Sequence, residues 1–211
     1  MRTLNTERRQ TIIDTATELF QEMGYERTSM NEVARRVGGS KATLYNYFAS
    51  KEALFEMVVR TYSTQLLNAA ALELATYSQG DMSFEQKLQR FGERMLGVLV
   101  TDHKAIKIYR CVLAEAGNSC VGELYHVAGS QESLEKLAEL MAAAMKAGEL
   151  QCVDPMLRAI QFTSLMKAEA MVMLLQREPV PRSTEQVREM VHRGVKLFLY
   201  GALAGSNNEQ K

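Results

Sequence analysis

Most of the residues whose types and spacing could do chemistry lie between Val33 and Phe55, in the stretch VARRVGGSKATLYNYFASKEALF. Two adjacent glycines precede a Ser-Lys pair, and three aromatic side chains follow closely. Such a stretch can cradle a phosphate, form an active-site turn, or let one short helix meet another at a sharp angle. The phosphate cradle is excluded, because GGSK lacks both the two-glycine spacing and the preceding apolar strand of a P-loop or dinucleotide-binding fold.

The spacing of apolar residues in this stretch favours two short helices joined by a tight turn. On a helical wheel Leu44 and Phe48 share one side of the second helix, so they can pack against Val33 and Val37 of the first. The pair Gly38-Gly39 permits the sharp turn between them, because glycine adopts positive φ at little cost. Two short helices that cross over such a turn form a helix-turn-helix.

The other side of the second helix presents polar groups that suit the major groove of DNA. Ala42 lets the backbone approach closely, and the Asn46 amide can pair bidentately with adenine or bond other base edges. Lys41 and Lys51 stand near the two ends of the helix, where they would bind phosphates on either side of the groove. The ordinary alternative is a helical hairpin whose tyrosines pack and whose lysines are solvated. The residues expected to contact DNA are Thr28, Ser40, Lys41, Ala42, Thr43, Tyr45, Asn46, Tyr47 and Lys51.

Charge supports a nucleic-acid partner only locally. Lys and Arg together number 25, as do Asp and Glu, so the chain as a whole has no basic field that would attract DNA. The charged residues at positions 33–51 are nevertheless all basic, namely Arg35, Arg36, Lys41 and Lys51. The sequence therefore places one positive patch at the helix-turn-helix.

The rest of the chain has helical periodicity, few prolines and no long alternation of apolar and polar residues, so we expect an all-α protein. A first helix at 6–23 supports the motif, and a fourth helix begins after Ser50 and continues as far as Tyr77. Capping signals predict the remaining helices at 83–100, 103–115, 124–146, 155–176 and 183–204.

With these elements placed, the stretch SMNEVARRVGGSKATLYNYFASKEALF resembles the DNA-binding motif of the TetR/AcrR family of bacterial transcriptional repressors. The resemblance extends from Glu7 to Tyr62 and includes the approach TELFQEMGYERTSM, the recognition helix S-K-x-T-L-Y-x-Y-F and the S-K-E-x-L-F start of the fourth helix. One departure is Gly39, where many members of the family have valine or a similar apolar residue. We expect a looser turn there and a changed tilt of the recognition helix.

Two later segments, IYRCVLAEAGNSCVGELY and MKAGELQCVDPMLRAIQF, resemble the C-terminal domain of the AefR-like branch of this family. The resemblance implies a helical homodimer with a pocket in each C-terminal domain, and release of DNA when a small-molecule inducer fills that pocket. It divides the chain into a DNA-binding domain at 1–62, with the motif at 31–50, and a ligand-binding and dimerisation domain at 63–211, joined by a shared helix. The residues expected to line the pocket are Met95, Tyr109, Arg110, Leu113, Phe162 and Met166.

The last two helices are apolar on more than one side, which fits a dimer interface. The run MKAEAMVMLLQ carries only Lys167 and Glu169 as charges, and the final helix has a similar excess of apolar residues. Pairing with symmetry mates would form an isologous four-helix interface, as the family's usual dimer implies. The alternative is that both helices only close the core of the monomer.

Other classes of function have weaker support. An enzyme is disfavoured because His103, His126 and His192 lie in separate helical regions and neither H-E-x-x-H nor G-x-S-x-G occurs. A thiol switch would use Cys111 and Cys120, beside which little lowers a thiol pKa. A helical scaffold would bind neither DNA nor a substrate. We expect no catalytic residue, no metal site and no cofactor.

The sequence also bears on compartment. The N-terminus lacks the continuous apolar run of a signal peptide, and no stretch approaches the roughly 18 apolar residues of a membrane helix. Three cysteines without metal-site spacing suit a reducing compartment. We therefore expect a soluble cytoplasmic protein without a membrane partner.

Overall fold

The computed structural model describes residues 5–64, 82–101, 103–126 and 131–202. These residues form helices and no strand, so the predicted all-α fold is confirmed. The helices are α1 Thr6–Met23, α2 Met30–Val37, α3 Lys41–Tyr45, α4 Lys51–Val59, the π-helical turn η1 Arg60–Thr64, α6 Phe84–Thr101, α7 His103–Glu115, α8 Val121–Tyr125, α9 Gln131–Lys146, α10 Pro155–Ala168, α11 Met171–Leu175 and α12 Thr184–Tyr200.

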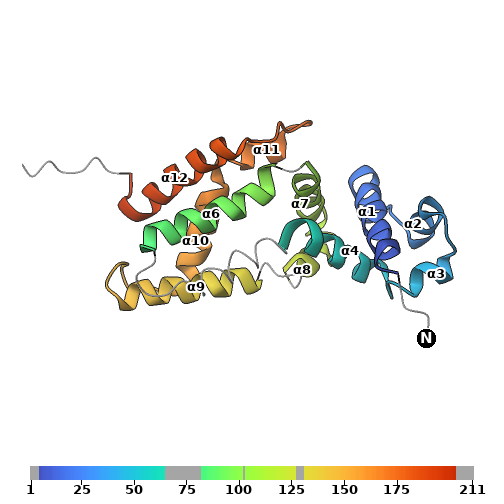
Figure 1. Ribbon diagram of the computed structural model, residues 1–211, viewed down its shortest axis with the longest axis horizontal. Coiled ribbons are helices and arrows are strands. Elements are labelled where there is room, and N and C mark those ends of the chain that lie inside the picture. The colour runs from blue at the N-terminus through green and yellow to red at the C-terminus, as the bar shows by residue number, and fades with distance from the viewer. Residues whose placement is uncertain (1–4, 65–81, 102, 127–130, 203–211) are drawn as a thin grey trace, which may run out of the picture.

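The molecule is elongated, with the first three helices at one end (Figure 1). The other end is built from α6, α9, α10 and α12, in which α12 packs along α6 and α10 packs along α9. Between the two ends lie α4, α7 and α8. Helix α7 contacts both halves of the molecule, because it packs on α1 and on α6.

Side-chain caps explain where the first four helices begin. Each N-cap oxygen accepts a hydrogen bond from a backbone N–H of the first turn, which stabilises a helix start by about 1 kcal/mol. The predicted caps Ser29, Ser40 and Ser50 are confirmed, with oxygen-to-nitrogen distances of 3.2, 3.0 and 3.1 Å. Asn5 caps α1 in the same way. Local sequence therefore sets the helix starts around the motif.

An aromatic cluster organises the core of the N-terminal end. The ring of Phe55 on α4 meets those of Phe20 and Tyr25 edge-on, with centroids 5.0 Å apart in each pair. This core, which we call the N-terminal core, does not stop at α4. It also includes residues of α7 and α8, namely Ile108, Cys111, Val112 and Val121. Helices α1 to α4 and part of the second half thus share one hydrophobic core.

A second core joins α6, α9, α10 and α12, and we call it the C-terminal core. Two glycines allow its helices to approach closely. An ideal Cβ atom on Gly92 would lie 2.6 Å from Val191 Cγ1, and one on Gly194 would lie 2.4 Å from Met166 Cε. A Cβ at Gly92 would collide with the branched, fully buried Val191, and one at Gly194 would force the end of Met166 to move. The absence of side chains at both positions therefore helps α6, α10 and α12 to cross closely.

Two helix boundaries differ from the sequence prediction. The expected single helix at 155–176 is wrong: α10 ends at Ala168, the Ala170 N–H bonds to the Lys167 carbonyl at 3.0 Å, and α11 starts afresh. Ala170 is 1% exposed, so the tight turn is held by tertiary packing. The last helix ends four residues before the expected Ala204, because Gly201 adopts a φ of 76° and stops it.

Two other predicted helices lie partly outside the described residues. The fourth helix continues from α4 into η1, and its predicted extension to Tyr77 lies beyond the residues that are described. The predicted helix at 124–146 corresponds to α8, which begins earlier at Val121, and to α9. Residues 127–130 between them are outside the described part of the chain.

Candidate DNA-binding surface and ligand cavity

The turn between α2 and α3 uses its two glycines differently. Gly38 ends α2 in the left-handed conformation, with a φ of 74°, whereas Gly39 is not among the glycines with positive φ. Instead, Gly39 makes room: an ideal Cβ there would lie 3.1 Å from Nη2 of Arg8 on α1. That same nitrogen donates a hydrogen bond to the Gly38 carbonyl at 3.2 Å. The turn that we expected to be loose is therefore tied to α1 by a residue that the sequence analysis missed.

Packing fixes the orientation of α3 on the N-terminal core. Leu44 and Phe48 are 2% and 4% exposed, and both belong to the cluster that contains Val33 and Ala34 of α2. The Arg9 guanidinium lies 5.0 Å above the Phe48 ring from the side of α1. With one side of α3 buried, its other side must face outward.

The outward side of α3 carries most of the residues predicted to contact DNA. Lys41, Ala42, Thr43, Tyr45 and Asn46 are exposed, and Tyr47 is half-buried. Lys41 Nζ lies 5.8 Å from the centroid of the Tyr45 ring, one turn along the helix. No hydrogen bond of the Asn46 amide to another described residue is present, so this amide is available to base edges. We call this side of α3 the reading face.

The hydroxyls of Ser40 and Thr43 are engaged with each other at the start of α3. Their oxygens are 2.8 Å apart, and Ser40 Oγ also accepts the Thr43 N–H at 3.0 Å. Both side chains are exposed, so each oxygen can still accept or donate one further hydrogen bond. The Ser40 side chain thus caps α3, and the Thr43 hydroxyl is bonded to this cap.

Two of the expected DNA contacts are placed differently. Thr28 is 1% exposed, and its hydroxyl donates to the Gly24 carbonyl at 2.8 Å and lies 3.2 Å from that of Leu19. It stabilises the connection between α1 and α2 and is not on the reading face. Lys51 is half-buried: its Nζ donates to the Glu26 carbonyl at 3.3 Å and lies 4.0 Å above the Tyr25 ring.

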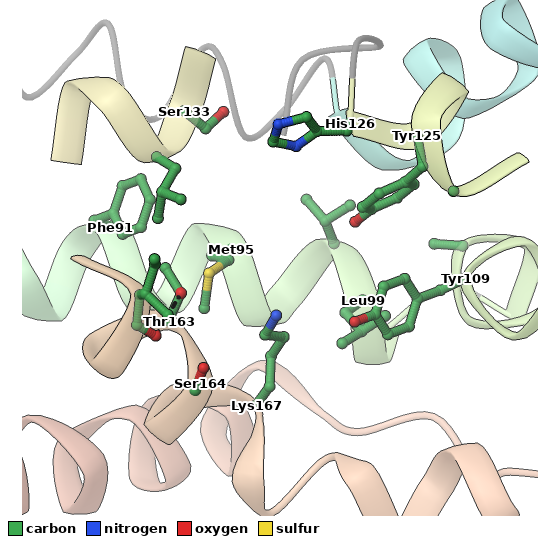
Figure 2. A pocket seen from close by; sticks show the side chains of 15 residues that line it. Phe91, Met95, Leu99, Tyr109, Tyr125, His126, Ser133, Thr163, Ser164 and Lys167 are labelled. Carbon is green, nitrogen blue, oxygen red and sulfur yellow. Dashed lines mark hydrogen bonds between the residues drawn. The ribbon is translucent and has the colours of Figure 1, made fainter. Parts of the chain in front are cut away.

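The second half of the molecule contains a partly open cavity of about 530 Å³ (Figure 2). A volume of this size suits a small organic molecule. Side chains of five helices, α6 to α10, form its wall. The lining residues are Phe91, Met95, Val98, Leu99, Ala105, Tyr109, Gly122, Tyr125, His126, Ser133, Leu134, Ile160, Thr163, Ser164 and Lys167.

Most of the cavity wall is apolar, and its polar groups are concentrated on a few side chains. The rings of Tyr109 and Tyr125 lie 5.7 Å apart, and burial raises the pKa of both phenols, so both hydroxyls stay protonated at neutral pH. Burial lowers the pKa of the half-buried Lys167 ammonium. Figure 2 shows this side chain pointing into the cavity.

The six residues expected in the pocket divide into three groups. Met95 and Tyr109 line the cavity. Phe162 and Met166 are instead 0% and 3% exposed within the C-terminal core, on the side of α10 that faces α6 and α12. They support the wall from behind.

Arg110 and Leu113 of α7 are not among the lining residues. The Arg110 guanidinium donates to the Gln176 carbonyl at 2.9 Å, and Leu113 is 49% exposed on the outer surface. The sequence analysis missed a polar stripe on α10, made of Thr163, Ser164 and Lys167. Lys167 follows Ser164 by three residues and Thr163 by four, so the three share one side of the helix, and this spacing was the available signal.

Known proteins resemble the chain in both halves. The profile described as bacterial regulatory proteins, tetR family, matches residues 12–58, from within α1 to near the end of α4. The profile of the AefR-like transcriptional repressor C-terminal domain matches residues 86–201, more than half of the chain. The chain belongs to the TetR family of transcriptional regulators.

Individual TetR-family and helix-turn-helix relatives cover most of the chain. YhgD, an HTH-type transcriptional regulator of Bacillus subtilis (strain 168), is 25% identical over 181 residues, which are 86% of this chain and 92% of that protein. A TetR-family regulator from Mesorhizobium loti is 27% identical, with a TM-score of 0.71 over 92% of this chain and 95% of that one. The flavonoid-responsive regulator FrrA is 28% identical, with a TM-score of 0.62 over 92% and 96%.

These TetR-family matches also bear on the other classes of function. The matched families and relatives regulate transcription and are not enzymes. Among the helices that the structure describes, none combines the length and the apolar content needed to span a membrane.

Proposed function

We propose that this protein is a transcriptional repressor that binds a palindromic operator as a homodimer and releases it when a small molecule fills the cavity. The reading face of α3 would enter the major groove, with Asn46 and Tyr45 at the bases and Lys41 at a phosphate. In a dimer, two such helices would lie in successive major grooves, about 34 Å apart. A regulator of this kind acts on DNA in the cytoplasm.

The observation that carries this proposal is that α7 and α8 contribute both to the cavity wall and to the N-terminal core. One side of these helices lines the cavity with Ala105, Tyr109 and Tyr125. The other side belongs to the N-terminal core, where Ile108 and Val121 are both fully buried. A molecule that displaces the cavity side of α7 therefore also displaces residues on which α1 and α4 rest.

Polar contacts strengthen this connection between α1 and α7. The Gln21 amide on α1 donates to the Lys104 carbonyl of α7 at 3.3 Å. An ideal Cβ on Gly24, at the end of α1, would lie 3.4 Å from the carboxylate of Glu115, at the end of α7. The two helices thus meet near both ends of α7.

To weaken operator binding a hundredfold, a ligand must prefer the non-binding arrangement by about 2.7 kcal/mol, which is within the usual range of allosteric coupling.

Exposed apolar residues support dimerisation through the last helices. Large apolar side chains of α10, α11 and α12 are exposed, and those of α11 and α12 recur at helical spacing. They are Leu157, Met171, Val172, Leu175, Leu197 and Tyr200. An interface between two copies of this chain would bury them. The relative FrrA is described as a flavonoid-responsive regulator, which supports a response to a small molecule in this protein as well.

The test begins with the operator. Genomic fragments retained by the purified protein are sequenced, and the enriched site is used in gel shifts. We expect Asn46→Ala to weaken specific binding by about 1–3 kcal/mol, because it removes a bidentate contact to a base. The matched control is Asn118→Ala, which removes an exposed amide at the end of α7, away from the reading face.

The dimer should persist in both variants, as judged by sedimentation. Equal affinity of wild type, Asn46→Ala and Tyr45→Ala for the enriched site would show that this side of α3 does not read DNA. The absence of any enriched site would overturn the proposed function as a whole.

A further inference from the structure

Lys167, in the last turn of α10, is the cationic side chain among the described residues that line the cavity. Its ammonium points toward the middle of the space, between the side of the cavity with Phe91 and Ser133 and the side with Tyr109 and Tyr125 (Figure 2). The described lining residues include no aspartate or glutamate. Within the described part of the chain, Lys167 also has no hydrogen bond or ion pair.

An ammonium in this position is costly for the protein alone. Moving a charge from water into an apolar space is unfavourable unless an opposite charge or hydrogen-bond acceptors accompany it. The other titratable lining groups, Tyr109, Tyr125 and His126, include no carboxylate. Among the described residues, the negative end of the α10 dipole offers some compensation, because it favours a cation in the last turn.

The dipole does not explain where the side chain points. A lysine that only complements a helix end can remain on the surface, as Lys146 does in the last turn of α9. Lys167 is on the cavity side of α10 instead, in line with Ile160, Thr163 and Ser164. A negative group of a bound molecule would complete its environment.

The rest of the wall sets the character of that molecule. Phe91, Leu99, Leu134 and Ile160 offer apolar surface around the ammonium, which suits an aliphatic or aromatic body. The two neutral phenols, on the side of α7 and α8, can donate hydrogen bonds to an anion.

We infer that the cavity binds an amphipathic monoanion, an apolar body with a single carboxylate or acidic phenolate, whose charge pairs with Lys167. This inference rests on the proposed function and names the chemical class of its inducer. It also assigns a mechanical role to the pair of tyrosines. An anion held between Lys167 and the phenols would draw α10 toward α7 and α8, the helices that support the N-terminal core.

The test uses pairs of probes that share an apolar body and differ in the charge of the head group, on the full-length protein without DNA. Decanoate is compared with decanol, and 2-naphthoate with 2-naphthalenemethanol, by calorimetry or by displacement of the neutral dye Nile red. We expect wild type to bind at least one of the two anions about tenfold more tightly than its neutral counterpart. The two pairs distinguish an aliphatic from an aromatic body.

Three variants assign the preference to one side chain. Lys167→Met leaves an unbranched apolar side chain that is one atom shorter, and it should abolish the preference for the anion while neutral probes still bind. Lys167→Arg should retain a preference, because the positive charge remains. Lys146→Met is the matched control, since it removes an exposed lysine from the last turn of a neighbouring helix, and it should behave as wild type.

Several outcomes would overturn the inference. Equal binding of anion and alcohol to wild type is one, failure of both anions to bind is another, and an undiminished preference in Lys167→Met is a third. Lys167→Met should unfold at the same temperature as wild type or above it, and the wild-type comparison stands without the variant. Because these measurements contain no DNA, loss of the anion preference and loss of operator binding can be told apart.

Discussion

The two hydrophobic cores of this protein differ in how completely they are filled. In the N-terminal core, aromatic rings meet edge-on, and the hollow found beside the helix-turn-helix has a volume of only about 10 Å³. The C-terminal core borders a cavity of about 530 Å³. A surface that must present fixed side chains to DNA needs rigid support, whereas a domain that accepts another molecule must leave room for it. The protein is thus packed tightly where it presents side chains to DNA and loosely where it can accept another molecule.

The comparison predicts different tolerance to the same kind of change. Phe55→Ala in the filled core should lower the free energy of unfolding by about 3–5 kcal/mol, because the ring is fully buried and its neighbours cannot close the gap. Leu99→Ala on the cavity wall should cost less than half as much, since it only widens an existing space. Urea unfolding followed by circular dichroism measures both. Equal losses would mean that the cavity wall is as tightly packed as the N-terminal core.

A smaller effect is expected where the C-terminal core is itself tight. Gly92→Ala places a Cβ 2.6 Å from Cγ1 of Val191, a stiff and fully buried side chain, and should destabilise by about 1–3 kcal/mol. Gly97→Ala on the same helix meets no described atom within 4 Å and should stabilise by about 0.5–1 kcal/mol through helix propensity. Differential scanning calorimetry of the pair separates the two. A stabilised Gly92→Ala variant would show that α6 and α12 are not in close contact in solution.

The smallest change concerns reactivity. Cys111 is buried in the N-terminal core, and burial raises the pKa of its thiol to about 11, so it is protonated at neutral pH. Cys120 and Cys152 are exposed. With Ellman's reagent at pH 8, we expect these two thiols to react first and Cys111 to react only when the protein unfolds. The double variant Cys120→Ser, Cys152→Ser should therefore show almost no rapid reaction. Rapid labelling of this variant would mean that the N-terminal core opens transiently in the folded protein.

Helix starts and the helix-turn-helix could be predicted from the sequence because their determinants are local. Ser29, Ser40 and Ser50 cap helices through bonds to residues three positions away, and Leu44 lies one turn from Phe48. The break at Ala170 could not be predicted in this way, since neither glycine nor proline marks it and the turn is held by contacts with distant segments.

The cavity was harder to predict than the reading face for a related reason. A helix such as α10 that is apolar on several sides gives no periodic signal of which side meets a space and which side meets a neighbour. The sequence analysis therefore predicted Phe162 and Met166 as lining residues and did not name Thr163 or Lys167, although all four lie on the same helix. The polar residues of that helix were the better guide.

The shared position of α7 and α8 also bears on how inducer preference can change over generations. A substitution on the cavity side of α7 alters a helix that is built into the N-terminal core, so a new preference gained there endangers the response to the operator. Residues of α9 and α10 that line the cavity, such as Leu134 and Thr163, do not belong to the N-terminal core. We expect lineages that diverge in inducer to vary most at these two helices, while α7 retains its ancestral side chains.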